Sequence, residues 1–223
     1  MAARCYAQRK VNGWVTDRVT DVAESTRLAR RAAALGGDDA VALCTAGFAI
    51  ADVAEDFESG DGLIERALKL NPNLAWAWLF SGWAKLWLGD PDTAIERVTR
   101  AMHLSPHDPH MFLMYTAIGT AHFFAGRYGE ALSWGERALR EKPEAFLALC
   151  VVAASHALVG QLAEAERTIE RLRKLEPEVR ISNLKNRFSL GRAEDLANWT
   201  GGLRKAGLPE KPSLGQTSKA AQD

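Results

Sequence analysis

The sequence predicts an all-α fold, a right-handed α-solenoid of about five antiparallel helix pairs that ends in a C-terminal capping helix. Three observations predict it: a phrase of eight residues recurs, each complete copy ends in proline, and the prolines follow at nearly constant intervals. They are Pro72, Pro106, Pro143 and Pro177, at intervals of 34, 37 and 34 residues. A fixed period of this length indicates one pair of helices stacked several times.

A degenerate copy of the phrase over residues 29–37 has Gly37 where the other copies have proline. The repeats therefore divide the chain into successive parts. We expect an incomplete first helix pair over 1–36, a repeat over 37–73, three further repeats over 74–107, 108–144 and 145–178, a turn and capping helix over 179–208, and a disordered tail over 209–223.

Each repeat is expected to contain two helices joined by a tight turn at a glycine. The turns are placed at Gly89, Gly126 and Gly160, because glycine readily adopts the positive φ at a helix C-terminus. Asp90 can cap the next helix, and Pro91 suits its first position, where no N–H is needed. In the repeat over 37–73, a longer turn is expected around residues 58–61.

Small residues recur where the two helices of a pair must approach closely. Gly82 and Gly119 belong to first helices, whereas Ala94, Ala131 and Ala165 belong to second helices. Larger side chains at these places would push the helices of a pair apart.

The phrase stops after Pro177, and the residues that follow predict a short turn and a terminal helix. Leu196, Trp199 and Leu203 are three and four residues apart, which gives this helix one apolar stripe. Because the end of a solenoid needs a cover for its apolar face, we expect this helix to act as a cap. Residues 209–223 have no apolar period, which predicts a frayed tail.

Composition excludes several classes of function. The 28 basic residues equal the 28 acidic ones, so no summed positive field attracts nucleic acid or anionic lipid. Residues 1–14 lack the apolar run of a secretory signal, and the longest apolar stretch, 74–88, is too short to span a bilayer. Cys5, Cys44 and Cys150 lie in apolar helical patterns, which is typical of a reducing compartment, and we expect a cytoplasmic protein.

The sequence contains no phosphate loop, zinc-binding histidine–glutamate helix, nucleophile elbow or cysteine pair, so we predict no catalytic residue and no cofactor. His103, His107 and His110 are the one constellation that suggests a metal. Pro106 and Pro109 interrupt the helix that would place these histidines on one face, which favours a solvated turn. A metal-dependent enzyme at this turn is the least favoured alternative.

The repeats resemble the tetratricopeptide repeat (TPR). In the copy that starts at Ala75, the signature positions are held by Trp78, Gly82, Gly89, Ala94, Ala101 and Pro106. The next copy starts at Phe112 and has Tyr115, Gly119, Gly126, Ala131, Ala138 and Pro143. The copy from Phe146 is weaker, since Leu149, Ala153 and Leu172 replace the aromatic, glycine and alanine. The resemblance implies a non-catalytic module for protein–protein interaction.

A second resemblance rests on residues 5–6, 9–14, 38–44, 73–78, 123–128 and 204–210. These strings are similar to the carboxy-terminal TPR region of bacterial adenylate/guanylate cyclase-like signalling proteins. In that family the repeats follow a cyclase or winged-helix DNA-binding domain. The resemblance thus implies a fragment that serves as a sensory or scaffolding arm, with any cyclase activity in an N-terminal domain outside these residues. A stand-alone TPR adaptor is the alternative.

The TPR resemblance also implies a partner-binding groove, because the first helix of each pair lines the concave side in that family. Carried over by register, its members are Phe48, Trp76, Leu79, Trp83, Leu86, Trp87, Thr116, Thr120, Phe123, Phe124 and Leu158. No lysine or arginine cluster that grips acidic tails is among them, so we expect an apolar protein or peptide segment as the partner.

The same aromatic stripe is typical of a packed core. Both interpretations hold if the chain's own tail or its N-terminal domain fills the groove.

Overall fold

The computed structural model describes residues 2–210, and within this range the chain is helical and has no strand. The α-helices are α1 (Ala2–Val11), α2 (Arg18–Leu35), α3 (Ala40–Ala54), α4 (Phe57–Leu70), α5 (Ala75–Trp87), α6 (Pro91–Leu104), α7 (Met111–Phe124), α8 (Tyr128–Glu141), α9 (Phe146–Leu158), α10 (Leu162–Leu175) and α11 (Ala193–Lys205), and a 3₁₀ segment, η1, spans Ile181–Asn186. The predicted all-α class is confirmed.

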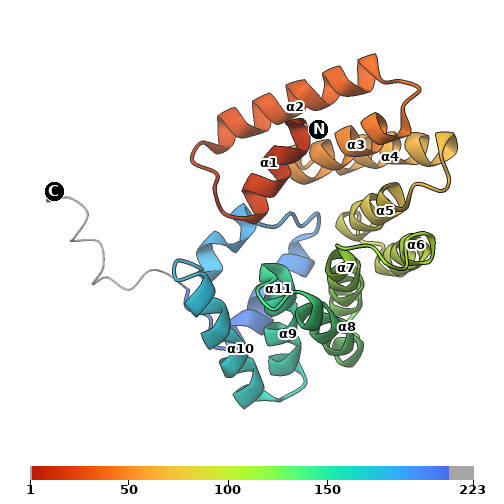
Figure 1. Ribbon diagram of the computed structural model, residues 1–223. Coiled ribbons are helices and arrows are strands. Elements are labelled where there is room, and N and C mark those ends of the chain that lie inside the picture. The colour runs from red at the N-terminus through yellow and green to blue at the C-terminus, as the bar shows by residue number, and fades with distance from the viewer. Residues whose placement is uncertain (1, 211–223) are drawn as a thin grey trace, which may run out of the picture.

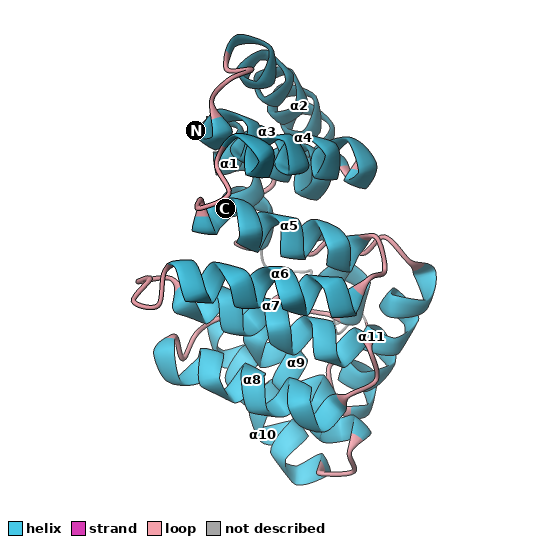
Figure 2. Ribbon diagram, turned by 90° about the vertical axis from the view of Figure 1, so that its right-hand side faces the viewer, coloured by secondary structure: helices cyan, strands magenta, loops and turns pink. Residues whose placement is uncertain are grey.

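The helices stack in consecutive pairs, from α1 with α2 to α9 with α10. Each pair contacts the next through α2 and α3, α4 and α5, α6 and α7, and α8 and α9. The first helices α3, α5, α7 and α9 also contact one another in that order, so they form an inner layer. Figure 1 shows the resulting arc with α2 near one end and α10 near the other, and Figure 2 shows the stack from the side.

The predicted glycine turns are confirmed. Gly89, Gly126 and Gly160 have φ values of 85°, 75° and 87°, a region that residues with a Cβ rarely adopt. Asp90 caps α6, because its side chain accepts a hydrogen bond from the N–H of Thr93, and Pro91 is the first residue of that helix. These local signals therefore place each second helix.

The predicted close approach within a pair is also confirmed. A Cβ added at Gly82 on α5 would overlap a methyl group of Val98 on α6. A Cβ at Gly119 on α7 would lie 3.2 Å from the backbone nitrogen of Gly135 on α8. The two helices of a pair are thus nearly in backbone contact where they cross.

The turn predicted around residues 58–61 is wrong. Helix α4 begins at Phe57, after Asp56, whose side chain accepts a hydrogen bond from the N–H of Ser59. The turn lies at Glu55, which has a positive φ of 58°. Gly60 instead belongs to the helix, where an added Cβ would lie 2.6 Å from the carbonyl oxygen of Gly47 on α3. This glycine is needed for close approach and not for chain reversal.

The range predicted as an incomplete first pair contains the short helix α1 and the longer α2, and both contact α3. At the other end of the chain, the predicted tail lies outside the described residues except for Pro209 and Glu210.

The C-terminal segment turns back into the concave side of the arc. After α10, η1 and the residues that follow cross towards α1 and α3, and α11 then packs on α9 and α7 (Figure 1). Trp199 and Leu203 of its predicted apolar stripe are buried there, and Leu196 is half-buried. On α10, Leu162 and Leu175 stay 45% and 47% exposed. The helix predicted as a cap therefore covers the inner layer, while these two leucines on α10 stay partly exposed.

Candidate functional site

The inner layer brings nine of the eleven predicted groove residues together in one apolar cluster, and the other two, Thr116 and Thr120, are buried polar residues of α7. Seven of the eleven are buried: Leu79, Trp83, Leu86, Trp87, Thr116, Thr120 and Phe123. The four that keep intermediate exposure are Phe48, Trp76, Phe124 and Leu158. Most of the expected surface is therefore covered, and these four mark where it reaches solvent.

Aromatic rings join the helices of the inner layer. Phe48 on α3 stacks on Phe80 of α5 with a centroid separation of 4.3 Å. Trp83 stacks on Trp87 one turn later at 6.1 Å, and the edge of Trp76 meets Phe80 at 5.5 Å. Offset and edge-to-face arrangements of this kind are favourable for aromatic pairs. The inner face of α5 is thus a continuous aromatic surface.

Residues 187–205, which we name the resident segment, cover this surface from within the same chain. Phe188 sets the edge of its ring against Trp83 at 5.9 Å and against Trp199 at 5.2 Å. Gly202 on α11 lies over Ala154 and Leu158 of α9, since its added Cβ would approach them to 3.0 and 3.2 Å. The segment therefore lies on the positions that the TPR resemblance assigns to a partner.

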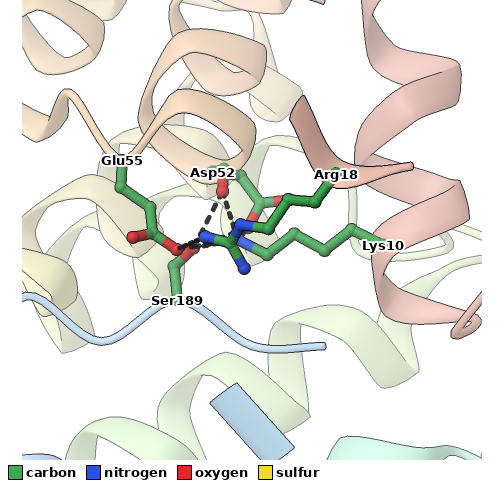
Figure 3. A network of polar contacts seen from close by, with 5 residues as sticks. All are labelled: Lys10, Arg18, Asp52, Glu55 and Ser189. Carbon is green, nitrogen blue, oxygen red and sulfur yellow. Dashed lines mark hydrogen bonds and ion pairs between the residues drawn. The ribbon is translucent and has the colours of Figure 1, made fainter. Parts of the chain in front are cut away.

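A polar network fixes the point where the resident segment lies against α1 and α3 (Figure 3). The ammonium of Lys10, whose residue is 4% exposed, donates to the carbonyl oxygen of Asp52 at 2.5 Å and to the hydroxyl of Ser189. Ser189 donates to the same carbonyl oxygen at 2.8 Å. Glu55 lies 3.5 Å from Lys10 and 2.7 Å from Arg18. Three distant parts of the chain thus meet at one lysine.

Burial raises the pKa of the Asp52 carboxyl above its ordinary value of 3.8, and the Lys10 ammonium opposes this rise. The two charged groups are 3.6 Å apart. The second carboxylate oxygen of Asp52 has no hydrogen-bond partner among the described residues. Burial of an incompletely paired ion is costly, so the network orients the segment more than it stabilises the fold.

Sequence reasoning missed this network. Asp52 is the lone charged residue of α3, a helix otherwise made of apolar and small residues. A charge in such a helix requires a partner, which was the available signal. The pattern does not say which of the basic residues provides it, because Lys10 is 42 residues away along the chain.

Arg187 connects the two ends of the described chain. Its guanidinium donates to the carbonyl oxygen of Val11 at 2.9 and 2.7 Å and pairs with Glu176 at 3.0 Å. The same group lies 3.7 Å above the ring of Phe146. A cation that combines ring contact with charged and neutral acceptors holds one geometry well, so the entry of the resident segment is fixed at both ends of the arc.

The half-exposed end of the aromatic surface lies at Trp76. The guanidinium of Arg4 on α1 lies 4.5 Å from its ring centroid, and the ring of His110 meets its edge at 5.6 Å. His103 and His107 are exposed. Among residues 2–210, no group of three or more His, Cys, Asp or Glu side chains is arranged to hold a metal ion. His110 is therefore an aromatic neighbour of Trp76.

The thiols of two buried cysteines, Cys44 and Cys150, are poorly reactive near neutral pH. Burial raises the pKa of the Cys44 thiol to about 11 and that of the Cys150 thiol to about 12. Because the thiolate is the nucleophile, neither side chain is activated for covalent chemistry near neutral pH. Both pack as small apolar groups in the inner layer.

No protein-family model and no curated protein matches the sequence. Likeness appears among solved structures. The chain is similar to PilW, a type IV pilus biogenesis factor, with TM-score 0.66 and 17% identity over 92% of this chain and 89% of that one. The chain is also similar to MamA, with TM-score 0.56 and 16% identity over 71% of this chain and 90% of the MamA chain. A third similar structure is YrrB, described as a TPR protein with an unusual peptide-binding site. Its TM-score is 0.52 and its identity 17%, over 80% of this chain and 90% of the YrrB chain.

These similar structures are TPR proteins, so the likeness confirms the predicted TPR-type solenoid as the fold. At this level of identity it carries nothing about activity or partner. None of the helices described is long and apolar enough to cross a lipid bilayer.

Proposed function

We propose that the chain is a non-catalytic protein-interaction module whose concave face binds an apolar segment of a protein partner. The observation that carries the proposal is the occupied inner layer: a peptide-like stretch of the chain already lies along the aromatic surface of α5 and on Ala154 and Leu158 of α9. A surface that holds one amphipathic helix by its apolar side suits another of the same kind.

The composition of the accessible positions supports an apolar partner. Phe48, Trp76, Phe124 and Leu158 present carbon surface, and none of the predicted groove positions is lysine or arginine. Recognition of an acidic tail relies on such cations. The similar protein YrrB is described as having a peptide-binding site, which agrees with the use of this fold to hold a peptide.

The proposed setting is the arm of a cyclase-like or winged-helix signalling protein, on the strength of the sequence strings that resemble that family. Any nucleotide chemistry would then reside in an N-terminal domain, and that domain is itself a candidate partner. A stand-alone cytoplasmic adaptor is the alternative. Sequencing of the DNA upstream of this coding sequence distinguishes the signalling arm from the stand-alone adaptor. A cyclase or winged-helix domain encoded there in the same reading frame favours the signalling arm.

The proposal is tested by peptide display against the whole chain. Amphipathic apolar peptides should be enriched, and Trp76→Ala should weaken their binding about tenfold or more, as expected for a buried aromatic anchor. The matched control is Trp14→Ala, because Trp14 is 64% exposed and is not part of the inner layer. Enrichment of peptides that bind both variants equally would place the binding surface elsewhere and reject the proposal.

A further inference from the structure

We infer that the resident segment is a built-in competitor for the groove, and that the partner carries the same pattern: an aromatic residue, a hydroxyl residue, a glycine two positions later and then an amphipathic helix. This inference rests on the proposed function, which it makes more specific. The four features are Phe188, Ser189, Gly191 and the helix α11. Each contacts a different part of the inner layer, so together they describe a template.

The aromatic position is defined by a ring on either side. Phe188 is buried and makes T-shaped contacts with Trp83 of α5 and with Trp199 of α11. An aliphatic side chain would fill part of this space but would lose both edge-to-face contacts, which are favourable beyond burial alone.

The hydroxyl position is defined by the polar network. Ser189 accepts a hydrogen bond from Lys10 and donates one to the carbonyl oxygen of Asp52. A hydroxyl group satisfies both roles at once, whereas an apolar side chain would leave the buried ammonium with one acceptor fewer. The partner residue at this place therefore needs to donate and accept.

The glycine position is defined by the backbone at the end of α5. A Cβ added at Gly191 would overlap the carbonyl oxygen of Trp87 and would lie 3.2 Å from the ring of Phe57. Neither the backbone at the end of a packed helix nor a packed ring moves aside without cost. Only glycine fits here. Beside it, Arg192 donates to the carbonyl oxygen of Gly89 at 3.3 Å, which ties the segment to the turn after α5.

The helix is defined by one apolar face and one small residue. Trp199 is 1% exposed and Leu203 is fully buried, while Arg204 and Lys205 on the opposite side are exposed. Gly202 allows α11 to approach α9 closely at Ala154. The hydroxyl of Tyr128 donates to the side-chain oxygen of Asn198 at 3.3 Å. Recognition of the helix thus depends on close packing of its apolar face and on the hydrogen bond between Tyr128 and Asn198.

The fit of the resident segment is incomplete, which leaves room for a better ligand. Among the described residues, the indole N–H groups of Trp87 and Trp199 and one carboxylate oxygen of Asp52 lack hydrogen-bond partners although they are buried. Each buried unsatisfied group carries a free-energy cost, because it has lost its hydrogen bonds to water. A partner that supplies an acceptor near Trp87 and a donor near Asp52 would recover part of that cost.

Tethering gives the resident segment an advantage that a partner must overcome. A short connection corresponds to an effective concentration on the order of millimolar. If the segment occupies the groove about 99% of the time, the apparent affinity of a partner falls about 100-fold. A partner therefore binds weakly unless its affinity for the groove is high enough to displace the resident segment.

The test uses the whole chain and a fluorescein-labelled synthetic peptide of residues 185–208, with binding followed by anisotropy. Gly191→Ala in the chain should weaken the resident segment and raise peptide affinity at least about tenfold over the unmodified chain. Gly201→Ala is the matched control, because an added Cβ at Gly201 meets nothing within 4 Å. The reciprocal changes in the peptide should reduce binding for Gly191→Ala but not for Gly201→Ala, where the added methyl meets nothing and favours the helix.

Equal peptide affinity for the Gly191→Ala and Gly201→Ala chains, both helical by circular dichroism, would overturn the inference. If the Gly191→Ala chain does not fold, hydrogen exchange on the unmodified chain decides the matter. An excess of isotope-labelled peptide should speed exchange of the resident amides in 193–205 and leave those of α6 unchanged, and no acceleration at peptide saturation would overturn the inference. If display-selected peptides still bind in a manner that depends on Trp76, the proposed function survives that failure.

Discussion

Replacement of Trp83 by alanine tests whether the aromatic surface is both core and groove. The side chain is 8% exposed and contacts Trp87 on its own helix and Phe188 of the resident segment. Truncation of a buried tryptophan costs about 3–5 kcal/mol. For a chain of this length 1 kcal/mol shifts the melting temperature by about 2–4 °C, so we expect a fall of about 6–20 °C.

The part of this cost that belongs to the resident segment is measured by a double-mutant cycle. Leucine at Trp83 and at Phe188 keeps apolar bulk, so each single change should cost about 1–3 kcal/mol. The pair shares one edge-to-face contact at 5.9 Å, which is worth about 0.5–1.5 kcal/mol beyond burial. The double variant should therefore be less destabilised than the sum by that amount.

Urea unfolding followed by circular dichroism is the suitable assay, because removal of a tryptophan alters fluorescence directly. Trp14→Ala serves as the control and should change stability by less than about 0.5 kcal/mol, since that residue is exposed. Additivity of the two leucine variants within about 0.3 kcal/mol would mean that Phe188 does not rest on Trp83. The placement of the resident segment on the inner layer would then be refuted.

Three further predictions concern the rest of the fold. Burial lowers the pKa of His122 below its ordinary value of 6.5, so the neutral form is favoured in the folded chain. The free energy of unfolding, measured with urea at several pH values, should therefore decrease as the pH falls below 6.5, and it should decrease less steeply in the His122→Gln variant. One of the three thiols should react with a thiol reagent at pH 8 before unfolding and all three afterwards, because Cys44 and Cys150 are buried with raised pKa values. Gly82→Ala should destabilise the native chain by about 1–3 kcal/mol through overlap with Val98, and by less in the Val98→Ala variant, where only the 3.1 Å approach to the backbone oxygen of Ala94 remains; an equal cost in both backgrounds would contradict the observed packing.

The repeat architecture was predictable because its signals are local. Gly89 adopts a positive φ, Asp90 caps the following helix, and Pro91 begins it, all as expected from adjacent residues. The close approach at Gly82 also follows from register, since the repeat fixes which residue faces the paired helix. The wrong prediction of a turn at residues 58–61 has the same origin. Glycine is typical both of turns and of close helix crossings, and only the contact of Gly60 with Gly47 shows that a crossing is present here.

The candidate site was predictable only in part. The register placed Trp76 and Trp83 on the inner layer, but the amount of each ring that reaches solvent depends on what covers it. Nothing near Lys10 in the sequence points to Asp52, 42 residues away, or to Ser189, 179 residues away. Contacts over such separations depend on how the whole arc curves, which the period alone does not specify.

The sequence by itself determined that this protein is a stack of helical hairpins with an apolar, aromatic inner layer, because periodicity, capping and turn chemistry act over a few residues. Only the tertiary structure decided that the chain's own C-terminal segment lies in that layer, where its Ser189 and Arg187 bond to Lys10 and Val11 at the end of α1. The physical reason is that an amphipathic helix specifies an apolar face but not its neighbour. That choice depends on which exposed apolar surface the finished stack presents within reach.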